Sequence, residues 1–186
     1  MLVLASSSPR RSELLRNAGF DFRVHASNVP EIHTPGELPE QYVRRLSSSK
    51  AQAVVPENSD SFILGADTVV IVDHHILEKP SDATDARRML RLLSGRAHQV
   101  TTGVCLITPD RHTDVRTETT DVTFSKLSEE EIDFYISTGE PMDRAGAYAI
   151  QGLASRWVQG ISGCYFNVVG LPIPLVYRML REHRAI

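Results

Sequence analysis

A serine- and arginine-rich segment near the start of the chain, SSSPRR at residues 6–11, combines hydroxyl and guanidinium groups. It follows the apolar residues 2–5, and Ser8 with Pro9 is typical of the first residues of a helix. Free backbone N–H groups and the positive end of a helix dipole favour a bound phosphate, to which arginine donates two hydrogen bonds. The alternative is that Ser8 only caps the helix and that both arginines are solvated.

A single carboxylate, Asp67, interrupts the most apolar run of the chain, residues 62–72, whose other members are all uncharged. The β-branched residues of this run predict a central strand covered on both faces. A buried carboxylate is costly unless a metal, a cation or hydrogen bonds compensate for its lost hydration. We therefore expect Asp67 at a bulge or strand end facing a cleft, as a general base or metal ligand. Alternatively, the strand ends at Gly65 and Asp67 belongs to a turn.

Lysine is rare in this chain, with only three lysines among twenty basic residues. Lys50 falls on the apolar stripe of the helix predicted over residues 39–55, four positions after Leu46. Its ammonium either reaches the solvated rim or points into a polar pocket. Lys79 is held extended by Pro80. The residue pattern alone does not decide the role of either lysine.

The segment at residues 143–152, DRAGAYAIQG, is rich in small residues that allow close approach of the backbone. Its Gln151 offers an amide that can pair with the edge of a nucleotide base. The alternative is a tight turn followed by a buried strand, with the glutamine satisfied inside the protein.

The remaining pattern predicts alternating strands and helices, with a hairpin around residues 109–110. Either Asp82 or Thr84 caps a helix that ends near residues 94–95, and Ser128 opens a capping box for another. Strands are predicted at residues 2–5, 22–26, 62–72, 98–107, 115–124, 148–150, 157–158 and 165–169, and a last helix at 175–181. This order predicts one α/β domain over residues 1–186, with a mixed sheet and flanking helices.

The composition of the chain excludes several classes of function. The chain has 186 residues, 41% of them hydrophobic, and a formal net charge of −3, so it lacks the broad basic field of nucleic-acid or anionic-membrane binders. Two cysteines are too few for a disulfide framework, and the apolar start is too short for a signal peptide or membrane span. We expect a cytoplasmic protein that binds neither nucleic acid nor membrane.

Eight segments, in this order, resemble the Maf family of nucleoside triphosphate pyrophosphatases: LASSSPRR, RRLSSSKA, LGADTVV, EKP, LLSGRAHQVTTGV, LSEEEID, EPMDRAGAYAIQG and YFNVVGLP. The resemblance covers nearly the whole chain. It implies a fold like that of the inosine-triphosphate pyrophosphatases, with two lobes around a deep cleft, and a homodimer. It also implies cleavage of a nucleoside triphosphate to the monophosphate and pyrophosphate with a divalent cation, Mg²⁺ or Mn²⁺.

Carried over position by position, the resemblance implies substrate-binding residues in two parts of the chain. The phosphate-binding serine and arginines of the family fall on Ser6, Arg10 and Arg11. Thr68 and Gln151 fall where the family contacts the substrate and its base.

The same resemblance implies a catalytic group of two acids and two lysines. The proton acceptor of the family falls on Asp67 and its lysines on Lys50 and Lys79, while its acidic cleft residue falls on Glu31 in a loosely aligned loop. Asp67 and Glu31 would hold the metal. Whether Asp67 is the general base or mainly a metal ligand stays open.

The substrate branch follows from the segment AGAYAIQG at residues 145–152. An AGAYGIQG-type segment accompanies the family branch that acts on dTTP and UTP, and this chain departs from it only at Ala149. Two alternatives stay open. One is a non-catalytic nucleotide sensor in division control, and the other is a pyrophosphatase directed at 7-methyl-GTP or inosine triphosphate.

Overall fold

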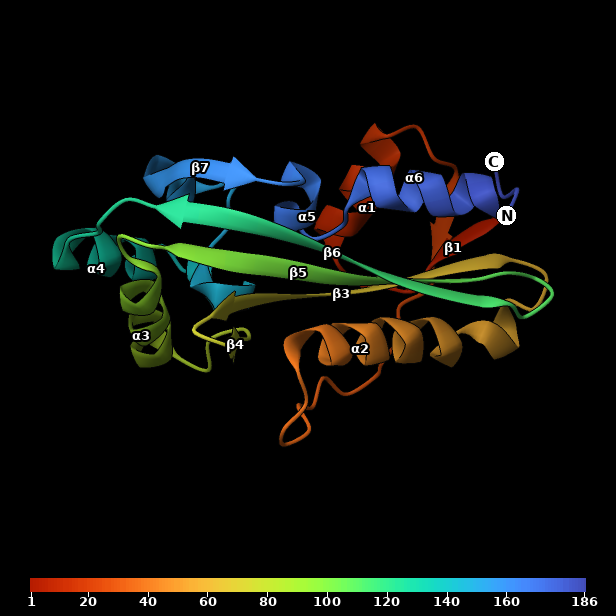
Figure 1. Cartoon of the computed structure of the whole chain (residues 1–186), viewed down its shortest axis with the longest axis horizontal. Helices are drawn as coiled ribbons and strands as arrows, with labels where there is room; N and C mark the ends of the chain where they lie inside the picture. Colours follow the sequence, from red (N-terminus) through yellow and green to blue (C-terminus); the bar gives the residue numbers. More distant parts are fainter. The chain divides into compact units, whose positions relative to one another are not determined.

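One mixed sheet of seven strands organises the protein, as seen in the computed structural model, which describes residues 1–186 (Figure 1). Its strands are β1 (Leu2–Leu4), β2 (Phe22–Val24), β3 (Phe62–Val72), β4 (His75–Leu77), β5 (Ala97–Ile107), β6 (Thr113–Phe124) and β7 (Val158–Ser162). The neighbours follow the order β2-β1-β3-β5-β6-β7, and β4 pairs with β3. β1 is parallel to β2 and β3, whereas β4 and β7 pair antiparallel with β3 and β6. The predicted α/β class with a mixed sheet is confirmed.

The chain divides into two units that are discontinuous in sequence. The first consists of Met1–Thr68, Thr102–Glu118 and Gly170–Ile186, and the second of Val69–Thr101 and Thr119–Val169. Strands β3, β5 and β6 contribute residues to both units.

The first unit holds three helices, α1 (Pro9–Asn17), α2 (Pro39–Ala53) and α6 (Ile173–Glu182), and the short 3₁₀ helix η1 (Val55–Glu57). Helix α2 covers one face of its strands, and α1 and α6 lie on the other face (Figure 1). Because both faces are covered, Val3, Leu4 and Ala5 are fully buried. This matches the continuous apolar pattern of parallel strands.

Two glycines let α2 lie directly on the strands of the first unit. A Cβ atom at Gly65 in β3 would lie 2.2 Å from the Ser47 carbonyl oxygen of α2. One at Gly103 in β5 would lie 2.3 Å from the Val43 carbonyl oxygen. Both distances are far below van der Waals contact, so these strand positions require glycine if α2 is to stay in place.

The second unit holds α3 (Ala83–Leu93), α4 (Glu129–Ser137), α5 (Tyr165–Val169) and three 3₁₀ helices, η2 (Glu140–Asp143), η3 (Ala145–Ala147) and η4 (Leu153–Trp157). Asp82, not Thr84, caps α3, because its side chain accepts a hydrogen bond from the Asp85 N–H at 2.8 Å. The predicted capping box between Ser128 and Glu131 is present at the start of α4. No helix of the protein combines the length and the apolar character needed to cross a membrane.

Of the three strands predicted in the C-terminal third, those at residues 148–150 and 165–169 are wrong, and the one at 157–158 is right only at Val158. Residues 148 and 149 follow η3 outside any strand, and a turn begins at residue 150. Within η3, Gly146 and Ala147 have φ angles of 68° and 59°, in the left-handed region. Residues 165–169 form helix α5, in which the buried Asn167 amide donates to the carbonyl oxygen of Val100 at 2.9 Å. Trp157 ends η4, and the strand begins only at Val158. Tertiary contacts outweigh local β-propensity in these segments.

Candidate active site

A lysine between two carboxylates forms the centre of the site in the first unit. Lys50 Nζ on α2 lies 2.6 Å from Asp67 Oδ1 on β3 and 2.5 Å from Glu31 Oε1 in the loop before α2. Lys50 and Asp67 are each only 6% exposed. Of the two placements that the helix pattern allows, the structure therefore shows the buried one, with the ammonium in a polar pocket.

Asp67 lies within β3, which continues to Val72, so neither a bulge nor a strand end is needed to place it there. Burial raises the pKa of the Asp67 carboxyl above its usual value, and the positive charges of Lys50 and Arg11 oppose this rise. A buried carboxylate held between cations suits a group that accepts a proton near neutral pH.

The guanidinium group of Arg11 is fixed at the start of α1 by three hydrogen bonds. Nε donates to the Gly170 carbonyl at 2.9 Å, while the two terminal nitrogens donate to Ser6 Oγ at 3.3 Å and to Thr68 Oγ1 at 3.1 Å. Burial lowers the pKa of Arg11, and the charges of Asp67 and Glu31 raise it. Arginine nevertheless remains charged at neutral pH. The serine-rich segment thus positions a cation next to the carboxylates.

The helix start around Ser8 has the predicted form but not the predicted cap. Pro9 occupies the first helical position of α1, yet the Ser8 side chain makes no capping hydrogen bond. Instead, the Ser8 N–H donates to Ser6 Oγ at 3.2 Å. Ser6 therefore joins the backbone at the helix start to the side chain of Arg11.

Thr102 is a polar residue of this site that sequence reasoning did not single out. Thr102 is fully buried, and its hydroxyl lies 2.8 Å from the hydroxyl of Thr68. The Thr68 hydroxyl also lies 3.2 Å from the Gly170 carbonyl oxygen. The only sequence signal for Thr102 is its place in the segment LLSGRAHQVTTGV. Nothing in a buried strand marks one threonine as a neighbour of a charged cluster.

The predicted residues are divided between the two units. The first unit brings together Ser6, Arg11, Glu31, Lys50, Asp67 and Thr68, and it also contains Arg10, which is half-buried in the first turn of α1. The second unit contains Lys79, exposed after β4, and Gln151, exposed in the turn after η3.

The carboxylates of Asp67 and Glu31 are the residues of this site that could hold a metal. No group of three or more His, Cys, Asp or Glu side chains gathers as a ready-made metal site. One oxygen of each acid nevertheless contacts the same cationic nitrogen, that of Lys50. These two oxygens pair with the ammonium of Lys50, and each acid has a second oxygen. Carboxylate oxygens are the donors that a hard ion such as Mg²⁺ or Mn²⁺ prefers. The residues present therefore fit such an ion.

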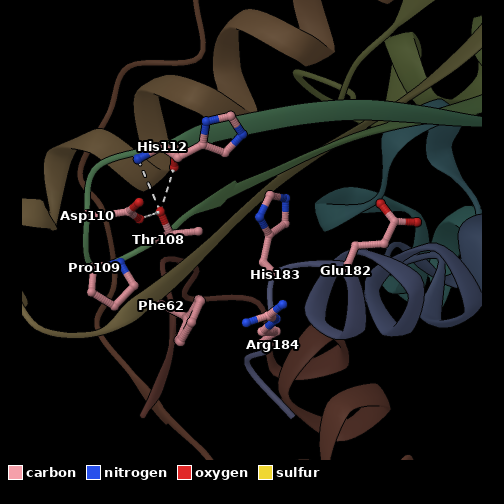
Figure 2. A pocket seen from close by; sticks show the side chains of 8 residues that line it. All are labelled: Phe62, Thr108, Pro109, Asp110, His112, Glu182, His183 and Arg184. Carbon is pink, nitrogen blue, oxygen red and sulfur yellow. Dashed lines mark hydrogen bonds between the residues drawn. The ribbon is translucent and has the colours of Figure 1, made fainter.

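A separate cavity of about 480 Å³ lies in the first unit, at the β5–β6 turn and the end of α6 (Figure 2). Its lining residues are Phe62, Thr108, Pro109, Asp110, His112, Glu182, His183 and Arg184. The Thr108 hydroxyl donates to Asp110 and accepts from the His112 N–H at 3.1 Å (Figure 2). The polar groups of this turn are therefore satisfied within it, and no predicted site residue lines the cavity.

Known proteins resemble the chain over nearly its whole length. The family described as Maf-like protein matches residues 1–183. A dTTP/UTP pyrophosphatase of Koribacter versatilis (strain Ellin345) is 61% identical over 97% of this chain and 93% of its own length. A dTTP/UTP pyrophosphatase of Symbiobacterium thermophilum is 49% identical over the same shares, 97% and 93%.

Among solved structures, the Ham1 protein of Staphylococcus aureus aligns with 98% of this chain and 98% of its own, with a TM-score of 0.53. Its sequence identity is 15%, so this likeness concerns the fold alone. It agrees with the α/β fold that the sequence predicts.

Proposed function

The chain belongs to the Maf-like protein family, and on that premise we propose that it hydrolyses nucleoside triphosphates, chiefly dTTP and UTP, to the monophosphate and pyrophosphate. The observation that carries the proposal is the buried pair of Asp67 and Lys50 beside the fixed guanidinium of Arg11. The two relatives described above are named dTTP/UTP pyrophosphatases, which supports the same reaction and substrates.

Binding of the triphosphate is assigned to the cationic residues. A nucleoside triphosphate carries about four negative charges near neutral pH, so its binding requires several cations and hydrogen-bond donors. Arg10, Arg11, Lys50 and Lys79 supply the cations, and Ser6 supplies a hydroxyl. Because Arg11 is already held by three hydrogen bonds, little side-chain entropy is lost when it binds a phosphate.

Proton transfer is assigned to Asp67. A water oxygen attacks the α-phosphorus and the bond from this phosphorus to the pyrophosphate oxygen breaks. The Asp67 carboxylate accepts the proton of the water. The rise in its pKa that burial causes makes Asp67 a better base than a solvated aspartate. Lys50, 2.6 Å away, stabilises the carboxylate before the reaction and the phosphate charge during it.

Asp67 and Glu31 would hold a divalent cation, Mg²⁺ or Mn²⁺. This cation would neutralise negative charge on the phosphate oxygens. Lys50 contacts both of these carboxylates and so keeps them close to each other. Glu31 is the more exposed acid, with 43% of its side chain accessible against 8% for Asp67. It can therefore change position as the charged substrate binds.

Recognition of the base is assigned to Gln151, with Thr68 as a further substrate-binding residue. Uracil and thymine present one N–H between two carbonyl groups, a pattern that a side-chain amide can partly match. The Gln151 side chain is exposed and makes no hydrogen bond within the chain, so its amide is available to a ligand. The Thr68 hydroxyl is already oriented by Arg11 and Thr102.

We further propose that residues 1–186 act as one functional domain and that the protein is a cytoplasmic homodimer that does not bind nucleic acid. The family match to residues 1–183 supports a single functional domain. The net charge of −3 argues against a polyanionic partner such as nucleic acid. The homodimer and the cytoplasmic location are inferred from the family resemblance and the composition.

The experiment that tests the proposal is release of pyrophosphate by the purified protein with Mg²⁺ or Mn²⁺. The substrates are dTTP, UTP, CTP, GTP, inosine triphosphate and 7-methyl-GTP, with an EDTA-treated control. We expect preferential cleavage of dTTP and UTP that depends on the added cation. Tight nucleotide binding without pyrophosphate from any substrate would favour a nucleotide sensor, and preference for 7-methyl-GTP or inosine triphosphate would favour a purine-directed enzyme.

A further inference from the structure

Two side chains of the second unit hold both ends of the short segment that carries Gln151. Tyr135 Oη on α4 donates to Glu140 Oε1 at 2.8 Å and accepts a hydrogen bond from the Ala149 N–H at 3.1 Å. Glu140 Oε1 accepts a second hydrogen bond, from the Leu153 N–H at 3.1 Å. The hydroxyl and the carboxylate thus connect the residues two positions before and two positions after Gln151.

The segment is also held by the buried side chain of Ile150, but it has no strand or helix to fix its backbone. Residues 150–152 form a turn outside any strand or helix, and within it the Gly152 N–H donates to the Ala149 carbonyl at 3.0 Å. Tyr148 directly precedes the segment, and its hydroxyl lies 2.9 Å from Nε2 of the buried His98. The segment is therefore anchored at its two ends, whereas Gln151 at its centre is exposed.

The packing around Tyr135 and Glu140 leaves them little freedom. Tyr135 is fully buried, and burial raises the pKa of its hydroxyl, which keeps the proton that it donates to Glu140. A Cβ atom at Gly152 would lie 2.2 Å from Glu140 Oε1. The glycine thus leaves the space in which the carboxylate reaches the Leu153 N–H.

We propose that Tyr135 and Glu140 are positioning residues that set the place of the Gln151 amide and thereby the preference of the enzyme among pyrimidine triphosphates. This inference rests on the proposed pyrophosphatase function. Neither residue touches the substrate in this scheme, because each acts through the backbone of residues 149–153.

The test compares variants that differ in which hydrogen bond they lose. Tyr135→Phe keeps the ring and removes the hydroxyl, Glu140→Ala removes the carboxylate, and Glu140→Gln keeps one oxygen as an acceptor. Ser128→Ala is the matched control, because it removes the cap of the helix that carries Tyr135 without removing a contact to residues 149–153. For each protein, kcat and KM are measured with dTTP and CTP, together with the melting temperature.

We expect Tyr135→Phe and Glu140→Ala to raise KM for dTTP by about fivefold, the factor that corresponds to the loss of one hydrogen bond, with a smaller effect on kcat. The preference for dTTP over CTP should fall by the same factor. Glu140→Gln should retain most of this preference, and Ser128→Ala should retain it fully despite a lowered melting temperature. An unchanged preference in Tyr135→Phe and Glu140→Ala, or the same loss in Ser128→Ala, would overturn the proposal.

Failure of the proposed function gives a different result from failure of this inference. If the wild-type protein releases no pyrophosphate from any nucleotide, the proposed function is wrong. The ratio of the dissociation constants of dTTP and CTP, measured by calorimetry on the same variants, then decides the inference. If the wild type is active but Gln151→Ala leaves the substrate preference unchanged, the reaction stands and the positioning role is overturned.

Discussion

The ammonium group of Lys50 lies 2.6 Å from Oδ1 of Asp67, and both side chains are almost completely buried. Each ion is costly to remove from water alone, and together they compensate for part of that cost. The pair therefore links the stability of the first unit to the chemistry proposed for it, and variants at the two positions separate these effects.

Replacement of Asp67 by Asn is expected to lower kcat by about a thousandfold, within the range that general-base catalysis contributes. The amide cannot accept the proton of the attacking water. The fold should persist, since Lys50 keeps the carboxylate of Glu31 at 2.5 Å. Pyrophosphate release and thermal unfolding followed by circular dichroism check both expectations. A kcat near that of the wild type would remove Asp67 from the mechanism.

Replacement of Lys50 by Met is expected to lower the free energy of unfolding at pH 7 by about 3 kcal/mol, because it leaves Asp67 buried without its nearest cation. The loss should shrink on acidification. Burial already raises the pKa of Asp67 in the folded state above its unfolded value, and removal of Lys50 raises it further. Since the folded state then binds the proton more tightly, stability is recovered as the pH falls below that raised pKa.

The matched control for Lys50→Met is the double variant Lys50→Met/Asp67→Asn, in which neither ion remains. Urea unfolding of the four proteins of this cycle at pH 7 and pH 5 measures the coupling between the two residues. The double variant should be more stable at pH 7 than Lys50→Met alone. Equal stability of these two proteins would show that the buried carboxylate is not the source of the loss.

Buried His98 is expected to make the second unit less stable in acid. Burial lowers the pKa of His98 to about 4, and it is only 3% exposed, with its Nδ1 lacking a hydrogen-bond partner. The unfolded chain binds a proton at this residue near the ordinary histidine pKa of 6.5 and the folded chain does not, so the free energy of unfolding falls as the pH drops from 6.5 toward 4. The slope contributed by one such group is at most about 1.4 kcal/mol per pH unit.

His98→Gln tests this slope, since an amide has no charge to gain but can still reach the Tyr148 hydroxyl. Urea unfolding at pH 7 and pH 5 should show a smaller loss of stability in the variant than in the wild type. Every other group is identical in the two proteins, so its contribution cancels in the comparison. The same loss in both proteins would exclude His98 as its cause.

Substitution of Gln151 by Ala is expected to change the ranking among dTTP, UTP and CTP more than it changes the dependence on the metal. The amide is assigned to the base and not to the phosphates, so the concentration of Mg²⁺ that gives half-maximal activity should stay the same. Steady-state kinetics with the three substrates measure both effects. If the ranking is unchanged and only the metal dependence moves, Gln151 does not read the base.

Replacement of Gly103 by Ala is expected to lower the free energy of unfolding by about 1–3 kcal/mol, the cost typical of overpacking. The added methyl group would meet the Val43 carbonyl of α2, which cannot turn away as a flexible side chain could. Activity should also fall, because α2 carries Lys50.

Gly160→Ala is the control for Gly103→Ala, since a Cβ atom there meets nothing within 4 Å. It should leave both the melting temperature and kcat close to those of the wild type. If Gly103→Ala behaves like Gly160→Ala in both measurements, α2 can move away from the sheet at no cost.

The elements that could be predicted from sequence are those with strong local signals. The apolar run of β3 and the capping box at Ser128 appear where the sequence places them, because uninterrupted burial and a paired cap leave few alternatives. Helix α5 could not be predicted, since four of its five residues have β-branched or aromatic side chains, which favour a strand locally. Its Asn167 finds hydrogen bonds on β5 and β6 that only the folded unit provides.

The residues of the candidate site could be singled out from the sequence by their types, but the contacts between them could not be predicted. The helical stripe places Lys50 on the apolar side of α2 but leaves the rim and the pocket both open, and the charge of Asp67 stands out in an apolar strand. Neither pattern pairs the two residues. Their pairing depends on how closely α2 approaches β3, which Gly65 permits. A distance between two elements remote in sequence is set by packing and leaves no local pattern.

The two glycines under α2 also have an evolutionary consequence. The carbonyls of Val43 and Ser47, which Gly103 and Gly65 face, lie one helical turn apart. An alanine at either strand position would meet the backbone of α2, the helix that carries Lys50, and no smaller side chain on α2 can relieve a contact with its backbone. Selection for the reaction should consequently hold these two small residues constant, while the exposed face of the helix drifts freely.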